Sequence, residues 1–340
     1  MLRFIWSEPS PLYSGRGGSE NYTIGQVREL QRRGIAAEIV TVGHGKHDGR
    51  DCLPDISFRD VDSIDDLAKL DGTLIFVYTP HPVQTRNPSF TILHAPPTVK
   101  MKQPKSHFVE SAKYTRFLTN SKFMQKVWGD YLGIKPNAFS IVSPFADPCF
   151  GQVPRPATKR KEVNVLYGGR LHIEKGIYTL LEALHHDILS TGYRFSITTA
   201  GNQTPDGKLI EDFARHHPLI NIIPARTTPP KMAQLFTEHD IVVMPSNHKY
   251  WHEAFGMLSV EAQHAGCRVV ASNDGGLPET DCGSLSLFEP GNSYALAKAI
   301  QAAAKAGPVS IADRIRATTH FTLSASVDAL LGVLKVHAAV

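Results

Sequence analysis

Cysteine is scarce and scattered in this chain of 340 residues. Its four cysteines show no Cys-x-x-Cys spacing and do not cluster with histidine; they are Cys52, Cys149, Cys267 and Cys282. This distribution argues against a disulfide-rich scaffold and against a zinc site of the common spacings. We therefore expect reduced, buried thiols and a cytoplasmic protein.

Long apolar runs are also missing. No stretch approaches the roughly 18 consecutive apolar residues that a membrane-spanning helix requires. The first residues, MLRFIWSEPSP, predict a strand that enters a loop rather than a signal peptide. With 42% hydrophobic and 20% charged residues, the chain has the composition of a globular protein and the length for two domains.

The net charge of +4 is too small to indicate a nucleic-acid partner, and we expect none. Positive charge is nevertheless concentrated between residues 100 and 135, where eight basic residues face two acidic ones. Two interpretations stay open for this region. It is either a solvated helix face or a surface for an anionic acceptor or lipid, which would bring peripheral contact with the inner membrane surface.

Apolar, β-branched runs alternate with helical patterns along the chain, which predicts parallel sheets with crossover helices. A helix is expected over Ser19–Arg33, with Gly34 ending it. The strands expected in the first half are Leu2–Ser7, Ala37–Val42, Thr73–Tyr78, Ser89–His94, Arg116–Asn120 and Phe139–Val142.

A polar, proline-containing stretch over residues 151–162 predicts an interdomain linker. The alternation then restarts with strands expected at Val163–Gly168, Tyr193–Ala200, Asn221–Ile223, Ile241–Pro245, Arg268–Ser272 and Ser284–Phe288. We therefore expect an α/β protein with domains over 1–153 and 154–322, and a last helix within 323–340 that packs back on the first domain. Ligands of open parallel sheets bind at the carboxyl ends of the strands.

The stretch Tyr167–Gly176 (YGGRLHIEKG) ends an expected strand and precedes a helical run over Ile177–Leu184. Glycines let the backbone approach a ligand, and a helix N-terminus presents N–H groups with positive partial charge. Arg170 and Lys175 add two cations, so the stretch predicts a diphosphate site. The alternative is a surface loop with incidental basic residues.

A second stretch, His252–Gly266 (HEAFGMLSVEAQHAG), places Glu253 just before an expected helix and Glu261 eight residues later within it. Eight residues are slightly over two helical turns, so both carboxylates are expected on nearly one face. The backbone N–H groups of Phe255–Leu258 would face a phosphate or sugar. Alone, this pattern also fits an amphipathic helix with two exposed glutamates.

An R-x4-K loop followed about 80 residues later by E-x7-E resembles the family-4 retaining glycosyltransferases of the GT-B fold, which has two Rossmann-like domains. The matching stretches are GGRLHIEKG (168–176), PSNHKYWHEAFGMLSVEAQHAGCRVVASNDGGLPE (245–279) and GRGGSE (15–20). The resemblance covers most of the chain in order and is more specific in the second half.

The resemblance implies a role for each matching residue. Arg170 and Lys175 would hold the pyrophosphate, Glu261 the ribose, and Glu253 the hydroxyls of the transferred sugar. The positions implied for the rest of the donor site are Gly17 and Gly18 in a closing loop, Arg226 and Thr227 near the nucleobase, Phe255, Gly256, Met257 and Leu258 near the phosphate, and Gly275, Gly276 and Glu279 in a further loop. Arg226 departs from the family, which often has glycine just before Thr227.

Two histidines compete for a place near the reacting sugar. His94 ends an expected strand where the family often has histidine, and His81 in Tyr78–Pro82 (YTPHP) is its rival. Two other patterns are set aside. The stretch 15–20 has glutamate where a dinucleotide fingerprint needs its third glycine, and Asp60–Asp62 (DVD) is interpreted as a solvated loop that leads into a helix.

The expected function is metal-independent transfer of a hexosyl unit from a UDP- or GDP-sugar, with no cofactor besides this co-substrate. The resemblance implies retention of anomeric configuration. A glycan, a lipid-linked compound and a small molecule stay open as acceptors. The alternatives are a nucleotide-sugar 2-epimerase and a non-catalytic nucleotide-sugar-binding module, and the broken glycine pattern disfavours a dehydrogenase.

Overall fold

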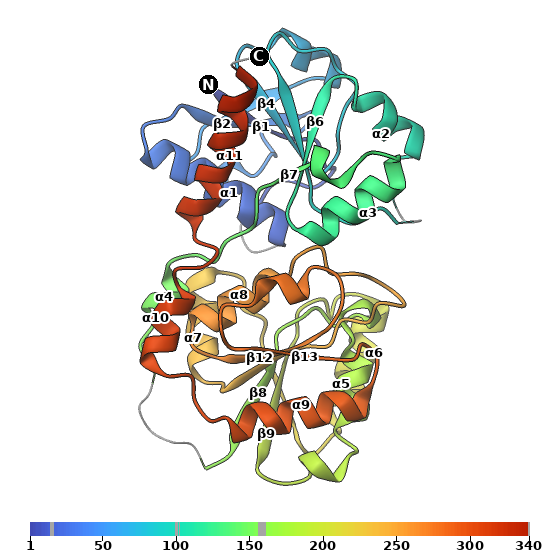
Figure 1. Ribbon diagram of the computed structural model, residues 1–340, viewed down its shortest axis with the longest axis vertical. Helices are drawn as coiled ribbons and strands as arrows, with labels where there is room; N and C mark the ends of the chain where they lie inside the picture. Colours follow the sequence, from blue (N-terminus) through green and yellow to red (C-terminus); the bar gives the residue numbers. More distant parts are fainter. Residues whose placement is uncertain (14–16, 99–100, 102, 156–160, 339–340) are drawn as a thin grey trace. The chain divides into compact units, whose positions relative to one another are not determined.

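The computed structural model describes residues 1–13, 17–98, 101, 103–155 and 161–338, arranged in two compact units (Figure 1). The first unit consists of Met1–Phe145 and Leu323–Val340, and the second of Ala146–Thr322. Gly15, Arg16, Lys100 and Lys102, which the sequence analysis singled out, lie outside the described residues.

The described part of the first unit contains one parallel sheet in the order β3-β2-β1-β4-β5-β6-β7. Its strands are β1 (Leu2–Trp6), β2 (Ala37–Val42), β3 (Phe58–Val61), β4 (Thr73–Val77), β5 (Ser89–Leu93), β6 (Thr115–Thr119) and β7 (Ser140–Ile141). Its helices are α1 (Gly18–Arg32), α2 (Lys105–Ser111), α3 (Lys122–Leu132) and α11 (Leu323–Ala338), with 3-10 turns η1 (Arg50–Cys52), η2 (Ile64–Lys69) and η3 (Pro136–Ala138).

The last helix, α11, lies beside α1. Val327 and Leu330 are fully buried in the same apolar core as Val27 and Leu30 of α1. Polar contacts reinforce the packing, since the Gln26 amide donates to Ser326 Oγ at 3.1 Å. The chain therefore completes the core of its first unit with its final helix.

The second unit has a parallel sheet in the order β10-β9-β8-β11-β12-β13. Its strands are β8 (Val163–Tyr167), β9 (Tyr193–Thr198), β10 (Ile220–Ile223), β11 (Ile241–Met244), β12 (Arg268–Ser272) and β13 (Leu285–Phe288). Its helices are α4 (Cys149–Gln152), α5 (Ile177–Ala183), α6 (Pro205–Arg215), α7 (Pro229–Thr237), α8 (Met257–His264), α9 (Ser293–Lys305) and α10 (Ile311–Ala317), with 3-10 turns η4 (Ile173–Lys175), η5 (Asp187–Leu189) and η6 (Leu277–Thr280).

Residues 146–153 belong to the second unit, whereas the sequence placed the end of the first domain at residue 153. Helix α4 packs there, with Phe150 buried against Phe236 at a ring distance of 5.7 Å. The Arg314 guanidinium donates to three carbonyls of this segment, those of Phe150, Gly151 and Val153. These contacts fix residues that look like a linker in the sequence because they are polar and rich in proline.

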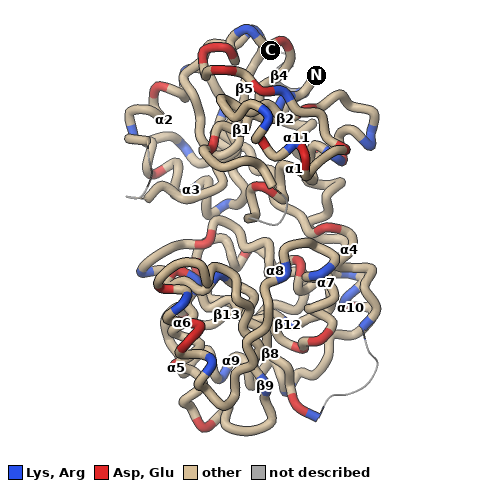
Figure 2. Tube along the Cα trace, turned by 180° about the vertical axis from the view of Figure 1, so that it is seen from behind, with Lys and Arg blue, Asp and Glu red and all other residues tan. Residues whose placement is uncertain are grey.

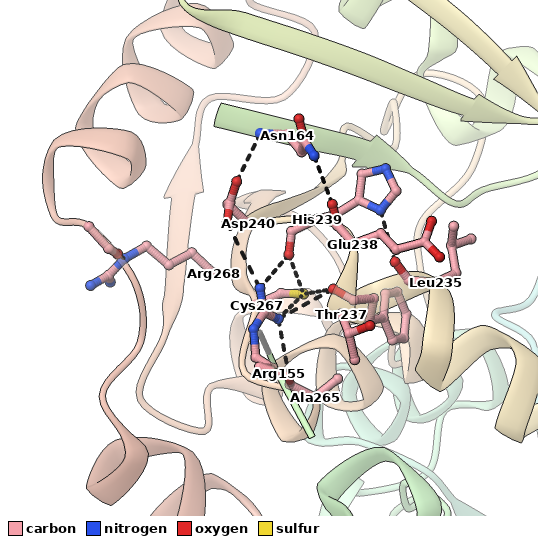
Figure 3. A network of polar contacts seen from close by, with 12 residues as sticks. Arg155, Asn164, Leu235, Thr237, Glu238, His239, Asp240, Ala265, Cys267 and Arg268 are labelled. Carbon is pink, nitrogen blue, oxygen red and sulfur yellow. Dashed lines mark hydrogen bonds and ion pairs between the residues drawn. The ribbon is translucent and has the colours of Figure 1, made fainter. Parts of the chain in front are cut away.

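Arg155 fixes the end of the same segment within a network of carbonyl groups (Figure 3). Its guanidinium donates to the His239 carbonyl at 2.6 Å and to the Ala265 carbonyl at 3.1 Å, and lies 3.2 Å from the buried Cys267 Sγ. The chain enters and leaves the second unit at neighbouring points, since the Ala146 N–H donates to the Phe321 carbonyl at 3.0 Å and Ala146 pairs with Thr322 as an isolated parallel bridge.

Strand β3 corrects the interpretation of Asp60–Asp62 as a loop. Asp60 and Val61 lie in this edge strand, and the Asp60 carboxylate accepts hydrogen bonds from Thr41 Oγ1 at 2.7 Å and from the Gly45 N–H at 2.8 Å. The carboxylate therefore ties the end of β2 to β3. The strand escaped prediction because Phe-Arg-Asp-Val is half polar and has no fully buried residue.

Candidate functional site

The topology of the second unit fixes where ligands should bind. Strands β8 and β11 are neighbours, but the chain continues from β8 to β9 on one side and from β11 to β12 on the other. Such a switch point at the carboxyl ends of two parallel strands is the usual binding place of an open α/β sheet. Both stretches singled out in the sequence follow these two strands.

The loop after β8 lies close to side chains of two helices. A Cβ atom on Gly168 would lie 3.1 Å from Met232 of α7 and 3.3 Å from Leu258 of α8. The buried Tyr167 holds the next residues, because its hydroxyl donates to the Arg170 carbonyl at 2.7 Å. Tyr167 therefore holds the backbone of the loop, while the Arg170 side chain is exposed.

Gly176 joins this loop to the segment after β11. Its φ is +68°, and a Cβ atom there would lie only 1.6 Å from the Pro245 carbonyl oxygen. Only glycine permits both the backbone conformation and this approach. The contact fixes Lys175, the preceding residue, opposite the residues that follow β11.

Lys175 and Glu253 form a direct ion pair in this site. Lys175 Nζ lies 2.5 Å from Glu253 Oε1, which also accepts from Ser246 Oγ at 2.7 Å. Glu253 is buried, and burial by itself would raise its pKa, but Lys175, the Ser246 hydroxyl and the charge of Arg170 outweigh burial and lower it. Glu253 is therefore ionised at neutral pH within a cationic loop.

Glu253 precedes helix α8, as expected, but the helix starts too late for the two glutamates to lie on nearly one helix face, which corrects that expectation. Helix α8 begins only at Met257, after Gly256 with φ +106°. Glu253 is positioned by its backbone, because the Gly276 N–H donates to its carbonyl at 2.7 Å. Gly275, with φ +60°, would place a Cβ atom 2.3 Å from the same carbonyl oxygen, so the matching loop needs glycine here.

The residues between Glu253 and α8 are fixed from the apolar side. Phe255 is 3% exposed and packs edge-on against Phe321 at 5.1 Å between ring centroids. Phe321 has φ +47°, which is rare for a bulky residue. Met257 and Leu258 occupy the first turn of α8, whose N–H groups have no carbonyl partner within the helix.

Glu261 lies in the second turn of α8, beside the start of α4. Burial raises its pKa to about 7, and the nearby Asp147 carboxylate contributes to the shift. Asp147 itself accepts from the Cys149 N–H at 2.9 Å. Glu261 therefore changes its charge near neutral pH, unlike Glu253.

The remaining matches in the second unit have less defined surroundings. Arg226 and Thr227 are exposed in the loop between β10 and α7, where the Ala225 N–H donates to Thr199 Oγ1 at 3.2 Å. Glu279 lies in η6. The roles of Asp147, Tyr167 and Ser246 were missed. Tyr167 and Ser246 bond to nearby residues in irregular loops, which no sequence pattern marks, and the effect of Asp147 on Glu261 depends on tertiary packing.

The first unit contains the other predicted residues. Gly17 precedes α1 in extended conformation and Gly18 is its first residue. His94 follows β5, with its ring 4.9 Å from that of Tyr22, and burial lowers its pKa to about 4. His81 follows β4 and lies 2.8 Å from Ser7 Oγ; burial and His107 lower its pKa to about 4 as well. Both imidazoles are neutral at pH 7.

The basic region is partly neutralised within the part that the structure describes. Lys113 pairs with Glu110 at 2.5 Å and Lys126 with Asp130 at 2.6 Å, while Lys105 lies over the Tyr131 ring at 5.4 Å. Charges of both signs are spread over the chain trace (Figure 2). Among the described residues, no helix combines the length and the apolar composition needed to cross a bilayer.

Known proteins match this chain over part of its sequence and over its fold. Residues 162–305 match the family described as "Glycosyl transferases group 1". A glycogen synthase of Mycobacterium tuberculosis (strain CDC 1551 / Oshkosh) is 33% identical over 126 residues, which are 37% of this chain and 29% of that relative. The sequence likeness thus spans less than a third of this relative's length.

Solved structures match almost the whole chain. A glycosyltransferase from Rickettsia africae ESF-5 has a TM-score of 0.76 at 19% identity, with 98% of this chain and 97% of that chain covered. Anabaena HepE in complex with UDP and glucose has a TM-score of 0.71 at 17% identity, with 98% and 99% covered. The resemblance is therefore confirmed for residues 162–305, which match the group 1 glycosyl transferases, and for the GT-B fold of the chain.

Proposed function

We propose that the protein is a retaining glycosyltransferase that moves a hexosyl unit from a UDP- or GDP-sugar to a glycan, a lipid-linked compound or a small molecule. The observation that carries the proposal is the Lys175–Glu253 ion pair beside Arg170 at the β8/β11 switch point. The family of residues 162–305 supports transfer, and the HepE complex with UDP and glucose supports a nucleotide-sugar donor.

In this proposal Arg170 and Lys175 bind the diphosphate. An ammonium group has three donors, so Lys175 can give one to Glu253 and direct others to phosphate oxygens. The exposed Arg170 guanidinium can bind two phosphate oxygens at once. These cations, with the N–H groups at the start of α8, stabilise charge on the leaving nucleotide without a metal ion.

The two glutamates then have different tasks. Glu253, ionised and held by Lys175 and Ser246, accepts hydrogen bonds from hydroxyls of the transferred sugar. Glu261 accepts from the ribose hydroxyls, which requires its charged form. Arg226 and Thr227 would lie near the base, and Gly17 and Gly18 near the donor phosphate and acceptor.

The proposed transfer reaction follows from this arrangement of residues. The bond between the anomeric carbon and the phosphate oxygen breaks, and a bond to the acceptor oxygen forms on the same face. The acceptor's proton passes to an oxygen of the leaving phosphate. His94, neutral at pH 7, would contact the reacting sugar. Catalysis would thus consist of positioning and electrostatic stabilisation.

For the cellular setting we propose the cytoplasm, with peripheral contact at the inner membrane surface through residues 100–135. Lys122, Arg116 and Lys135 of this region lie among the described residues and add to its positive charge. Co-sedimentation with vesicles of phosphatidylcholine alone and with added phosphatidylglycerol tests the contact. Binding that requires the anionic lipid and disappears in high salt supports it, and equal recovery in both supernatants contradicts it.

Calorimetric titration with UDP and GDP, followed by product analysis with the matching sugars, tests the proposal. We expect Glu261→Ala to weaken nucleotide binding and Lys175→Ala chiefly to lower the rate of transfer. Lys305→Ala, an exposed cation on α9, is the matched control and should behave as wild type. Unchanged affinity and rate in both site variants would end the assignment, and release of an epimerised sugar without acceptor would favour the epimerase.

A further inference from the structure

The first unit has its own topological switch point, between β1 and β4. The chain continues from β1 to β2 on one side and from β4 to β5 on the other. The segments that follow the two strands are cross-linked by side chains. Ser7 Oγ lies 2.8 Å from His81 Nε2, and Thr79 Oγ1 donates to Glu8 Oε1 at 2.8 Å. The carboxyl edge of this sheet is therefore a fixed, polar surface.

Tyr78 stands at this edge in an unusual conformation. It follows β4 directly, and its φ is +78°. Its N–H still donates to the Ile92 carbonyl at 3.1 Å, so pairing with β5 continues while the side chain changes direction. A bulky residue in the left-handed region costs about 1–2 kcal/mol, and such strain is concentrated at functional sites. The residue is 39% exposed in this conformation.

A stack of rings supports Tyr78 from the protein side. The His94 ring lies nearly parallel to it, at 15° and 6.4 Å between centroids, and Tyr22 packs edge-on against His94. Among the described residues, the buried His94 Nε2 has no hydrogen-bond partner. A buried polar atom without a partner is uncommon. Because the proposed function assigns His94 to the reacting sugar, its ring neighbour Tyr78 lies beside the place of transfer.

We propose that the acceptor presents a pyranose ring, which lies on the face of Tyr78 at the carboxyl ends of β1 and β4. One face of a pyranose is lined with C–H bonds and packs on an aromatic ring, while its hydroxyls need polar partners at the rim. Glu8, which accepts from Thr79 next to Tyr78, supplies such a partner here. Tyr78 thus selects a cyclic sugar over an acyclic polyol or an alkyl alcohol, and this inference rests on the proposed transferase function.

The test measures binding of simple pyranosides to the full chain by saturation-transfer NMR. The probes are the methyl glycosides of glucose, galactose, mannose and N-acetylglucosamine, with sorbitol as an acyclic control. We expect at least one glycoside to bind in the millimolar range and sorbitol not to bind. Tyr78→Ala should weaken that glycoside at least ten-fold, and Tyr78→Phe, which keeps the ring, less than three-fold.

Tyr78→Gly separates a role in binding from a role in folding. Glycine adopts positive φ without strain, so this variant should unfold at a higher temperature than Tyr78→Ala and still fail to bind the glycoside. Affinity for UDP or GDP should stay unchanged in all three variants, since these ligands belong to the second unit. Absence of glycoside binding in wild type, or equal binding in Tyr78→Ala, would overturn the inference while nucleotide binding leaves the transferase proposal standing.

A last experiment tests whether the sugar on Tyr78 belongs to the acceptor or to the donor. The affinity of wild type and Tyr78→Ala is compared for a nucleoside diphosphate and for its sugar. We expect the ratio of the two affinities to be the same in both proteins. A ratio that falls in Tyr78→Ala would place the donor sugar on this ring and overturn the inference.

Discussion

At the scale of single residues, the candidate site depends on glycines that allow close approach and on carboxylates with contrasting surroundings. Gly176 and Gly275 bring separate loops into contact, and Glu253 and Glu261 differ in charge because only Glu253 has a cation beside it. The sequence predicted both glutamates, since their spacing is local. It could not predict Ser246 or Asp147, whose effect on these carboxylates arises only when α4, β11 and the loops pack together.

Gly176→Ala should disrupt the site more than an ordinary glycine replacement. The added Cβ would collide with the Pro245 carbonyl oxygen, which forces the two loops apart. We expect a loss of unfolding free energy of at least about 2 kcal/mol in urea titration, together with loss of nucleotide binding. Gly307→Ala is the matched control, because Gly307 has φ +72° with open space around it, and only the conformational cost of about 1 kcal/mol applies.

Glu261 should make stability depend on pH. Its folded-state pKa of about 7 lies above the usual 4.5, so the folded protein binds more protons between these values, and the free energy of unfolding falls as pH rises from 4.5 to 7. Glu261→Gln removes the buried charge. We expect its thermal midpoint to exceed that of wild type at pH 8 and the difference to vanish near pH 4.5, as followed by scanning fluorimetry.

Glu289→Gln, an exposed replacement in the same unit, is the control for that experiment. Parallel curves for wild type and Glu261→Gln across the whole range would show that folding does not shift the pKa of Glu261. Nucleotide affinity measured over the same range should rise with pH through 7 in wild type, if Glu261 binds ribose as proposed, since the ionised carboxylate is the better acceptor for hydroxyl groups.

At the scale of helices and strands, the positions of the strands were predicted better than the boundary between the two units. All six strands of the second sheet lie where strands were expected, and the first sheet differs mainly by β3, whose Arg59 and Asp60 give no strand pattern. Helix α1 was predicted with its ending glycine, Gly34, which has φ +74°. The place of segment 146–155 in the second unit was not predicted, because Arg155 and Arg314 join the segment to residues over 80 positions away.

Arg155→Ala tests that account. It leaves the carbonyls of His239 and Ala265 without their charged donor (Figure 3). We expect a loss of about 2–3 kcal/mol in the stability of the second unit, since hydrogen bonds to charged groups are worth about 1.5–3 kcal/mol. Arg155→Lys should recover little, because an ammonium cannot reproduce the planar fork.

The control is Arg194→Ala, which removes an exposed pair with Glu162 worth at most about 1 kcal/mol. Urea unfolding monitored by hydrogen exchange locates the effect. Equal losses for Arg155→Ala and Arg194→Ala would show that the carbonyl network does not hold the segment.

At the scale of the whole molecule, the chain forms two units whose cores are separate apolar clusters, and the first core includes its last helix. The alternation of strands and helices predicted the class of both sheets, because parallel strands need crossover connections. Strand order could not be read from this alternation, since it depends on which strands pair.

Leu330→Ala should therefore weaken the first unit alone. Leu330 is fully buried against α1, and truncation of such a side chain costs about 2–5 kcal/mol. We expect hydrogen exchange to rise across β1, β2 and α1, while the second unit keeps its protection. Lys335→Ala, an exposed position on the same helix, should change neither. Exchange that rises equally in both units would mean that they unfold together.

The pairing of Ala146 with Phe321 and Thr322 has an evolutionary consequence. A domain whose entry and exit points adjoin can be inserted into a host chain as one piece, because the host must supply only a single junction. Residues 146–322 thus form an insertion module, which recombination at this one junction can exchange as a whole without cutting the core of the first unit.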